Sequence, residues 1–383
     1  MKITIFINSL AGGGAERVVS HLLTYFYSKG IKIQLVLMED IVSYQLPPDI
    51  QITILRKNKR KESNYKKFFE LPLLAYYYAR ILNENKTDIS ISFLTRPNFI
   101  NLGSKLFSRK TKRIIGERSN PSLQYDFKTI KGYINSIIIK HTYHLSDGII
   151  ANSNGNSLDL HRNFSVPLKL IKKIYNPIDI NIIEKTEVNL NFFDKNYFNF
   201  VSVGRLDSGK NHKLLINAMN LIPNKNIRLY IFGDGPSYNL LNNLISNLKL
   251  QNQVFLKGFT REIFTYLKGA DCFLFGSKHE GFPNVILEAM ACELPIISTD
   301  CPFGPAEIMK NIETDTKNHN VSTRYGILVP VDSIKDMALA INKMVENKMY
   351  YNKCKDNVFF RAKDFDIDII MNEYFEYITS FQK

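Results

Sequence analysis

Strand, glycine-containing loop and helix follow one another repeatedly along this chain, and this order constrains the fold more than any other feature. Residues 2–8 are apolar enough for a buried strand, three glycines occupy 12–14, and residues 15–28 carry apolar side chains at helical spacing. The same frame returns after residue 198 and again after residue 272. Strands that alternate with helices are typical of parallel sheets covered by helices on both faces. Because 383 residues are too many for one ordinary core, the sequence predicts an α/β fold with two doubly wound, Rossmann-like domains.

Residues 276–307 carry two glutamates in different surroundings. Glu280 lies in a glycine-rich loop just before Pro283, which suits the first turn of a helix, and Glu288 lies inside an almost wholly apolar run. Free backbone N–H groups at a helix mouth can hold a carboxylate or the hydroxyl groups of a polar ligand. A carboxylate buried among apolar residues needs a partner, and the hydroxyl pair of a sugar would serve. For two such glutamates alone, a solvated Glu280 and a Glu288 paired with an arginine or a backbone amide are the plainer alternatives.

The segment EGFPNVILEAMA at 280–291, together with GRLDSGK and FGDGP upstream of it, resembles the nucleotide-sugar half of glycosyltransferase family 4. The similarity extends over nearly the whole chain, and the family consists of retaining enzymes with the GT-B fold. The resemblance implies two domains that face each other across a cleft, with Glu280 at the transferred sugar and Glu288 at the ribose of the nucleotide. One position departs from the family: Glu293 replaces the usual glycine, so the helix is expected to end without a glycine C-cap.

A predicted strand at 198–203 leads into a loop that carries Arg205 and Lys210. An arginine can bind two phosphate oxygens in a fork and a lysine adds a point charge, so the two could clamp a diphosphate. Alone this segment would more often be a surface loop, but the glutamate motif further along favours the diphosphate site. We therefore predict catalytic roles for Glu280, Arg205 and Lys210. The other donor contacts predicted in this half are Gly204, Phe259, Gly281, Phe282, Pro283, Asn284, Val285 and Glu288.

The glycine loop near the start of the chain can be compared with a dinucleotide-binding fingerprint. Arg17 occupies the position of the third glycine, and without that glycine the pattern is a weak signal. In the family that the chain resembles, this loop lets the backbone approach the donor phosphates or the acceptor. We therefore predict that Gly13 and Gly14 contact the donor.

Two arginines follow predicted strands in the first half, and side chains at the carboxyl ends of parallel strands point into the ligand crevice. Arg96 follows the strand at 88–94, and Arg118 follows the strand at 113–116. Many relatives carry a histidine at the position of Arg118, so we predict no histidine-based catalysis and assign both arginines to an acceptor phosphate. A structural ion pair between Arg118 and Glu117 or another acid is an equal alternative.

Positive charge is concentrated in the first half of the chain. The whole chain has a net charge of +14, and residues 1–190 hold 28 Lys and Arg against 15 Asp and Glu. Nucleic acid, a membrane surface and a phosphorylated lipid are the anionic partners that such a half could meet. Basic clusters at 56–67 and 105–113, the first of them followed by an aromatic segment, favour an anionic membrane surface, although a charge run is often only a solvated face.

A hinge is predicted at Asn176–Asp179, because Pro177 interrupts regular structure and the following residues are polar and aperiodic. We expect an N-terminal acceptor and membrane-facing domain at 1–178, a C-terminal nucleotide-sugar domain at 179–360, and a C-terminal helix at 361–383 that crosses back to the first domain as in the family. No apolar run reaches the roughly 18 residues of a transmembrane helix, and the start of the chain has the pattern of a strand rather than a signal peptide. We expect a cytoplasmic protein, peripheral on the inner face of the plasma membrane.

The function predicted on this basis is retaining transfer of a hexose or N-acetylhexosamine from a nucleotide diphosphate donor, a UDP-sugar in the first instance, to a lipid-linked glycan in bacterial surface polysaccharide biosynthesis. No cofactor and no metal are expected, since no paired aspartates accompany the motif and His141 and His144 lack a third ligand. A nucleotide-sugar epimerase on the same fold is one alternative, although its acid and base groups are not identifiable. A nucleic-acid-binding protein is the other, prompted by the basic first half.

Overall fold

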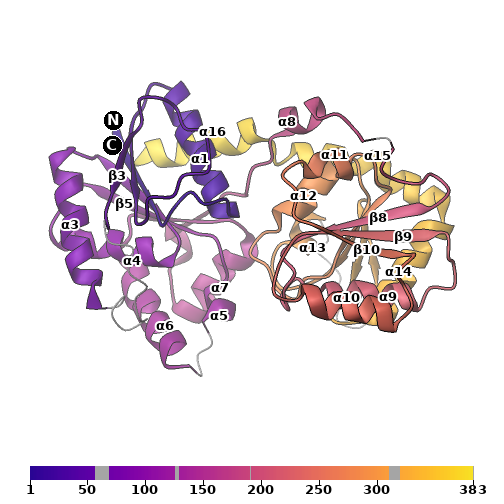
Figure 1. Cartoon of the computed structure of the whole chain (residues 1–383). Coiled ribbons are helices and arrows are strands. Elements are labelled where there is room, and N and C mark those ends of the chain that lie inside the picture. Colours follow the sequence, from indigo (N-terminus) through magenta and orange to yellow (C-terminus); the bar gives the residue numbers. More distant parts are fainter. Residues whose placement is uncertain (57–68, 126–128, 190, 310–319, 383) are drawn as a thin grey trace. The chain divides into compact units, whose positions relative to one another are not determined.

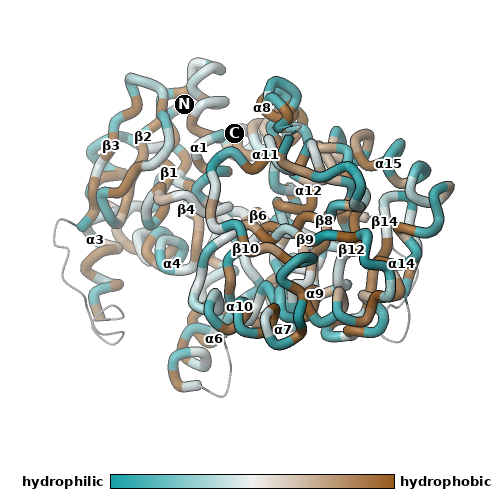
Figure 2. The backbone as a smooth tube through the Cα atoms, turned by 45° about the vertical axis from the view of Figure 1, so that its right-hand side comes forward, coloured by the Kyte–Doolittle hydropathy of each residue, from teal (hydrophilic) through white to brown (hydrophobic). Residues whose placement is uncertain are grey.

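The computed structural model describes residues 1–56, 69–125, 129–189, 191–309 and 320–382, and it divides into two compact units. Unit 1 consists of Met1–Pro177 with Ile367–Lys383, and unit 2 consists of Ile178–Asp366 (Figure 1). Each unit has its own sheet and its own apolar core. Figure 2 shows hydrophobic residues, in brown, along the strands of both sheets.

The sheet of unit 1 has seven parallel strands in the order β3-β2-β1-β4-β5-β6-β7. Its strands form because short apolar runs alternate with polar loops, and most of their residues are buried. The strands are β1 (Lys2–Ile7), β2 (Lys32–Leu37), β3 (Gln51–Ile54), β4 (Ile89–Phe93), β5 (Lys112–Glu117), β6 (Gly148–Ala151) and β7 (Ile171–Lys173).

Helices cover both faces of this sheet. One face packs Ile3, Ile5 and Ile7 against α1 and α16, which lie side by side (Figure 1). The other face packs β1 residue Phe6 against α3 and the inner strands against α4, α6 and α7. The described helices of unit 1 are α1 (Gly14–Ser28), α3 (Leu71–Glu84), α4 (Thr95–Gly103), α5 (Pro121–Gln124), α6 (Ile130–Thr142), α7 (Asn154–Phe164) and α16 (Ile367–Thr379), with short 3-10 turns at Ser104–Leu106, Tyr143–Leu145, Leu168–Leu170 and Ser380–Gln382.

The described sheet of unit 2 also has seven strands, in the order β10-β9-β8-β11-β12-β14-β13, with β13 antiparallel to β14 and the other neighbours parallel. The strands are β8 (Phe198–Val203), β9 (Ile227–Phe232), β10 (Val254–Gly258), β11 (Cys272–Phe275), β12 (Ile296–Thr299), β13 (Val321–Ser322) and β14 (Gly326–Val329). The helices are α8 (Ile180–Lys185), α9 (His212–Asn220), α10 (Tyr238–Asn247), α11 (Ile263–Leu267), α12 (Asn284–Ala291), α13 (Pro305–Ile308), α14 (Ile334–Glu346) and α15 (Lys348–Lys363). Helices α9, α10 and α14 share one core cluster with the sheet, while α12 packs against α15.

The strand order reverses at one point in each sheet. In unit 1 the reversal lies between β1 and β4, and in unit 2 it lies between β8 and β11. At such a point the loops from the carboxyl ends of the two strands diverge, and open α/β sheets bind their ligands there. The prediction of two doubly wound α/β domains is confirmed.

Two local features differ from simple expectation. The pattern after Tyr350 predicts a single helix that runs to Phe381, but the structure has α15, a break at Asp364–Asp366, and α16. The break forms because this segment pairs with the other end of unit 2: Ile178 N–H donates to Phe365 O at 2.9 Å, and Ile178 forms a parallel bridge with Asp366. Residues 361–363 therefore belong to α15 of unit 2.

The end of α12 shows how the chain manages without a glycine. Glu293 itself adopts the left-handed conformation, with φ of 63°. Leu294 N–H donates to Ala289 O at 3.0 Å and Glu293 N–H to Met290 O at 3.0 Å, which is the hydrogen-bond pattern of a Schellman cap. Helix α12 therefore ends in this cap without a glycine, and Glu293 adopts a left-handed backbone conformation that is strained for a residue with a side chain.

Candidate functional site

The reversal point of unit 2 brings two loops side by side. The loop at 204–211 follows β8 and the loop at 276–283 follows β11, and these two strands are neighbours in the sheet. Lys278 N–H donates to Gly209 O at 2.9 Å, which ties one loop to the other. Segments about 70 residues apart in sequence thus form one surface because parallel strands end at the same edge.

Lys210 and Glu280 meet across these loops. Lys210 Nζ lies 2.6 Å from Glu280 Oε1, with side-chain exposures of 28% and 14%. The ammonium group also lies 5.7 Å from the centre of the Phe275 ring. Two of the three predicted catalytic groups therefore contact each other, and each has remaining bonding capacity for a ligand that carries phosphate oxygens and hydroxyl groups.

Asp207 shapes the loop that carries the third predicted catalytic group. Asp207 Oδ1 accepts the backbone N–H groups of Gly209 and Lys210, both at 3.0 Å. Arg205 Nε lies 3.8 Å from Asp207 Oδ2, and its side chain is 72% exposed. The guanidinium group of Arg205 thus lies on the same loop as Lys210 and is open to solvent.

Glycines allow the loops after β8, β9 and β10 to stack closely. Gly204 N–H donates to Phe232 O at 3.0 Å, and Gly233 N–H donates to Gly258 O at 2.8 Å. Gly233 has φ of 142°, and a Cβ atom there would lie 2.0 Å from Gly204 O. The FGDGP segment at 232–236 therefore packs directly against the backbone of Gly204. Phe259, one of the predicted donor contacts, follows these loops in sequence with an exposed side chain.

The mouth of α12 is built from the glutamate motif and the loop at 301–307. Pro283 is the N-cap of α12, and its neighbour Phe282 is buried. Gly304 has φ of 107°, and a Cβ atom there would lie 2.4 Å from Pro283 Cδ. Glu280 N–H points to Pro302 O at 3.4 Å. The loop at 301–307 thus backs the loop that carries Glu280.

The remaining predicted donor contacts occupy this same mouth or the helix behind it. Gly281, Asn284 and Val285 are partly exposed at the start of α12, whereas Glu288 is buried in its second turn. Burial and the charge of Glu288 raise the pKa of the nearby Cys292 thiol above its ordinary range.

Two residues at this site were not singled out from the sequence. His212, the first residue of α9, is buried, and its burial and the charge of Lys210 lower its pKa to about 4. No partner of His212 Nδ1 occurs within the described ranges. Asp332 accepts from Asn211 Nδ2 at 2.9 Å and from Lys278 Nζ at 3.0 Å, so it connects both loops. The KNH sequence at 210–212 and the position of Asp332 just after β14 are the signals that could have pointed to them.

In unit 1, Arg118 makes extensive contacts within the protein. Its Nη1 donates to Asn176 Oδ1 at 3.1 Å and its Nη2 to the Tyr374 hydroxyl of α16 at 2.6 Å. The guanidinium also lies over the rings of Phe93 and Tyr374, at 5.2 and 5.7 Å. Glu117 accepts the Tyr143 hydroxyl at 2.8 Å and the backbone N–H of Arg118 at 3.1 Å. Among the residues that the structure describes, no acid forms an ion pair with the Arg118 guanidinium.

Arg96 lies in the first turn of α4. Its Nη2 is 3.4 Å from Glu70 Oε2, and Arg56 approaches the same carboxylate at 3.9 Å. Burial, followed by the charge of Arg56, lowers the pKa of Arg96. Gly13 and Gly14 form the N-cap and first residue of α1 and are exposed. The structure thus brings Glu280, Lys210 and Arg205 onto one pair of loops, while Arg96, Arg118, Gly13 and Gly14 belong to the other unit.

The basic cluster at 105–113 is only partly a surface feature. Arg113 is fully buried, with its guanidinium donating to backbone oxygens of Asn101, Thr111 and Ser108 and to the Ser104 hydroxyl. It cannot meet a membrane, so its assignment to that surface is wrong: Arg113 belongs to the buried strand β5, and the charge run alone does not show which of its side chains the fold covers. Lys105 and Lys112 pair with Asp147 at 3.4 Å each, and Arg109 and Lys110 are exposed. Of the other cluster, 56–67, only Arg56 lies within the described residues.

Neither a metal site nor a membrane span is found where the structure is described. Within those ranges, no group of three or more His, Cys, Asp and Glu side chains could hold a metal ion. None of the helices described is both long enough and apolar enough to cross a membrane.

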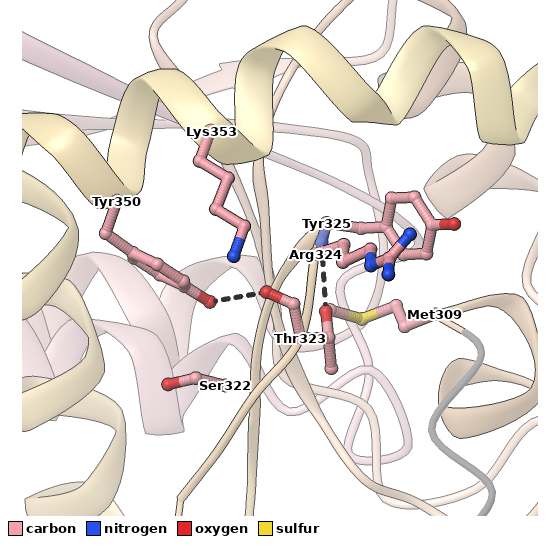
Figure 3. Close-up of a pocket in the computed structure, with 7 residues that line it drawn as sticks. All are labelled: Met309, Ser322, Thr323, Arg324, Tyr325, Tyr350 and Lys353. Carbon is pink, nitrogen blue, oxygen red and sulfur yellow. Dashed lines mark hydrogen bonds between the residues drawn. The ribbon is translucent and has the colours of Figure 1, made fainter.

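A cavity of about 560 Å³ lies elsewhere in unit 2 (Figure 3). Tyr350 and Lys353 extend from α15 toward the segment between β13 and β14, and the Tyr350 hydroxyl donates to Thr323 O at 3.1 Å. Tyr325 lies beside the amino end of β12, where its carbonyl accepts Ile296 N–H at 3.0 Å. Most of this cavity therefore belongs to the opposite end of the sheet from Glu280, and no predicted site residue lines it.

Models of known protein families match both halves of the chain. The family model described as "Glycosyltransferase Family 4" matches residues 12–182, and the model "Glycosyl transferases group 1" matches residues 184–359. A Campylobacter jejuni protein named N-acetylgalactosamine-N,N'-diacetylbacillosaminyl-diphospho-undecaprenol 4-alpha-N-acetylgalactosaminyltransferase is 36% identical over 382 residues, covering 98% of this chain and 99% of its own. A second C. jejuni protein, named GalNAc-alpha-(1->4)-GalNAc-alpha-(1->3)-diNAcBac-PP-undecaprenol alpha-1,4-N-acetyl-D-galactosaminyltransferase, is 25% identical over 99% of this chain and 98% of its own.

Solved structures show the same fold over the full chain. Anabaena Alr3699/HepE in complex with UDP superposes with a TM-score of 0.79 at 20% identity, covering 99% of this chain and 100% of the other. Sucrose-phosphate synthase from Thermosynechococcus elongatus gives 0.80 at 17% identity, with 99% of each chain covered.

Proposed function

The chain belongs to glycosyltransferase family 4, and from that premise we propose that it transfers an N-acetylhexosamine from a UDP-sugar to a lipid-linked glycan, with retention of the anomeric configuration. The names of the two Campylobacter relatives support the sugar and the acceptor class, and the UDP complex of a protein with the same fold supports the nucleotide. The proposed setting is bacterial surface polysaccharide synthesis.

The contact between Lys210 and Glu280 at the reversal point of unit 2 is the observation that carries this proposal. Loss of a diphosphate leaves negative charge on the phosphate and positive charge on the sugar ring. Lys210, Arg205 and the N–H groups at the mouth of α12 would stabilise the departing diphosphate, and Glu280 would hold hydroxyl groups of the sugar. The negative charge on the diphosphate grows as its bond to the sugar breaks. These groups therefore bind the transition state more strongly than the ground state, and this difference raises the rate.

Retention is proposed to proceed by attack on the same face that the leaving group vacates. The departing phosphate takes the proton from the acceptor hydroxyl, so no protein nucleophile is required. The cations of the loop at 204–210 supply the counter-charge, and we therefore propose turnover without a divalent ion. Activity that persists in excess EDTA would support this, and activity restored only by added Mg²⁺ or Mn²⁺ would contradict it.

We also propose roles for the other donor contacts and for the two arginines of unit 1. Glu288 would accept the ribose hydroxyls, and Phe259 would lie at the base. Gly204 and residues 281–285 would contact the diphosphate and sugar, and Gly13 and Gly14 would let the backbone approach a phosphate group. Arg96 and Arg118 are proposed to assist the acceptor diphosphate, in addition to the contacts that they make within unit 1.

Unit 1 is proposed to bind an anionic membrane surface on the cytoplasmic side. Its described residues include Phe69, Leu106 and Ile130 with exposures of 79%, 76% and 72%, and the exposed cations Arg109 and Lys110 lie close to Leu106 in the chain. Apolar side chains enter the acyl boundary while each basic side chain near the headgroups contributes about 1 kcal/mol. We propose no nucleic-acid partner for this unit.

The activity is tested by turnover and by ligand-dependent stability. Purified protein is incubated with UDP-N-acetylhexosamines, with and without a polyprenyl-diphosphate-linked glycan. Transfer to the glycan supports the proposal, whereas conversion of the UDP-sugar without acceptor would support the epimerase instead. UDP at 100 times its dissociation constant should add about 2.7 kcal/mol to the stability, and this gain should shrink in Glu288→Ala and Arg205→Ala. A full gain in both variants would remove these residues from the donor site.

Membrane binding is tested separately with vesicles that contain phosphatidylglycerol. Reversal of Arg109 and Lys110 to glutamate should reduce sedimentation with the vesicles. Reversal of the exposed Lys348 and Lys353 in unit 2 makes the same change in net charge and serves as the matched control. Equal loss in both variants would reduce the effect to net charge alone.

A further inference from the structure

Arg361, in the last turn of α15, is a buried arginine that the proposed chemistry does not use. Its residue is 8% exposed, and its guanidinium reaches three separate groups. Nε donates to Ile308 O at 2.7 Å, Nη2 donates to Glu307 O at 3.0 Å, and Nη1 pairs with Asp364 Oδ2 at 2.6 Å. Its plane lies over the Phe365 ring, 4.4 Å from the centre. A buried charge with this many bonds fixes the elements that it joins.

The first of these connections leads to the loop behind Glu280. Ile308 and Glu307 end α13, and the last carbonyl groups of a helix lack partners within it, so Arg361 satisfies them from outside. Helix α13 begins directly after Gly304, whose backbone packs against Pro283. Pro302, in the same loop, faces the N–H of Glu280.

The second connection reaches the same motif from the opposite direction. The rings of Phe365 and Phe282 lie 5.7 Å apart. Phe282 is buried and stands two residues after Glu280. Arg361 thus holds both the loop that backs Glu280 and the ring against which the Glu280 segment packs.

We propose that Arg361 is a positioning residue that fixes the Glu280 loop for the sugar of the donor, acting through α13 on one side and through Phe365 on the other. This inference rests on the proposed function, in which Glu280 holds the transferred sugar. The loop around Glu280 is neither helix nor strand, so its placement depends on such outside contacts. Small misplacements of a positioning group carry large costs in rate.

The UDP part of the donor is held by other elements. Lys210 is fixed by the loop that Asp207 organises, and Glu288 lies within α12. Loss of Arg361 should therefore affect recognition of the sugar while recognition of UDP is preserved.

The test compares UDP with UDP-N-acetylhexosamine by calorimetry in the full-length protein. Arg361→Met keeps an apolar chain against Phe365 and removes the N–H donors, while Asp364 remains half exposed and can be solvated. We expect the dissociation constant of UDP to stay unchanged, and the ratio of the UDP-sugar constant to the UDP constant to rise about tenfold, or about 1.4 kcal/mol. Glu280→Gln should raise the same ratio, and the double variant should add little beyond either single variant.

The matched control is Arg228→Met. Arg228 also stacks on an aromatic ring, 3.6 Å from the centre of Tyr197, and pairs with Asp194 at 3.4 Å. It lies near the amino end of β9, away from the Glu280 loop. This variant should lose stability without a change in the ratio. Two milder variants should raise the ratio of the UDP-sugar constant to the UDP constant as Arg361→Met does. Arg361→Lys keeps the charge but loses the several N–H donors of the guanidinium, and Phe365→Leu removes the ring that contacts Phe282.

The possible outcomes separate the two proposals. Absence of UDP binding by the unaltered protein would contradict the proposed function. Normal UDP binding with an unchanged ratio in Arg361→Met, Arg361→Lys and Phe365→Leu would overturn the positioning role. An equal rise of both constants would also overturn it, because that result describes a purely structural residue.

Discussion

The two units have the same sheet topology up to their reversal points but use the charges there differently. In unit 2, Lys210 and Glu280 come from the loops after β8 and β11 and pair with each other. In unit 1, Arg96 follows β4 and pairs with Glu70, while Arg118 follows β5 and is bound by Asn176 and Tyr374. Arg96 therefore has a position comparable to that of Glu280, whereas Arg118 lies one strand further from the reversal point, and the partners of both arginines differ from those in unit 2.

This difference teaches what distinguishes a binding charge from a structural one. Lys210 and Glu280 can each exchange their contact for a ligand group, because both belong to surface loops and keep some exposure. The guanidinium of Arg118 lies over the rings of Phe93 and Tyr374 and donates to a hydroxyl and an amide, so its removal would cost these groups their contact with it. A charge at the carboxyl end of a strand is therefore not sufficient to define a ligand site.

The largest effect expected from this comparison is on turnover. Glu280→Gln and Lys210→Met should each lower kcat by about a hundredfold or more, as removal of a group that stabilises transition-state charge does elsewhere. Steady-state assays with a UDP-sugar would measure it. Glu262→Gln, an exposed acid of the same unit, is the control. Unaltered kcat in both variants would place catalysis elsewhere.

The next largest effect expected is on how the stability of the two units depends on pH. The pKa of His212 is lowered from its ordinary 6.5 to about 4, chiefly by burial. The unfolded chain then binds the proton more tightly, so stability is intact above the unfolded pKa and falls by up to about 3 kcal/mol as the pH drops from 6.5 to 4. In unit 1, burial raises the pKa of Glu117, which has the opposite sign: folding of that unit gains from protonation.

Denaturant unfolding at several pH values would measure this contrast. In His212→Leu, the free energy of unfolding should fall less between pH 6.5 and 4 than it does in the unaltered protein. Replacement of the exposed His144 should leave this fall unchanged. The same slope in His212→Leu and in the unaltered protein would assign the acid sensitivity to other groups.

Arg118→Ala should destabilise the protein, because Arg118 is a structural charge of unit 1. Loss of its bonds to Asn176 and Tyr374 and of its ring contacts should lower the free energy of unfolding by about 1–3 kcal/mol. The dissociation constant of UDP should not change, and the KM for acceptor should rise if the guanidinium also serves the acceptor as proposed. Full stability together with weakened UDP binding would reverse the roles given to the two units.

The smallest expected effect concerns the end of α12. Glu293→Gly removes the side chain from a residue with φ of 63°, and should raise the free energy of unfolding by about 1 kcal/mol. Thermal unfolding would measure it, with the exposed Glu262→Gly as a control that should not stabilise. A loss of stability would mean that the Glu293 side chain makes contacts worth more than the backbone strain.

Much of the architecture could be predicted from local patterns. Alternation of apolar strands, glycine loops and amphipathic helices recurs every few tens of residues, so two doubly wound sheets followed from the chain itself. The segment EGFPNVILEAMA, with GRLDSGK before it, identified the region of Lys210 and Glu280. The sequence also showed that Glu293 would have to end its helix without the help of glycine.

Only the tertiary structure decided which charges are free to bind. Arg113 and Arg118 lie close together in sequence, yet Arg113 is buried with bonds to the backbone oxygens of Thr111 and Ser108, and Arg118 is held by Tyr374 of a helix from the far end of the chain. The break between α15 and α16 and the bonds of Arg361 likewise depend on distant residues. Periodicity is a property of neighbours in sequence, whereas the burial and the partners of a cation depend on segments brought together by folding.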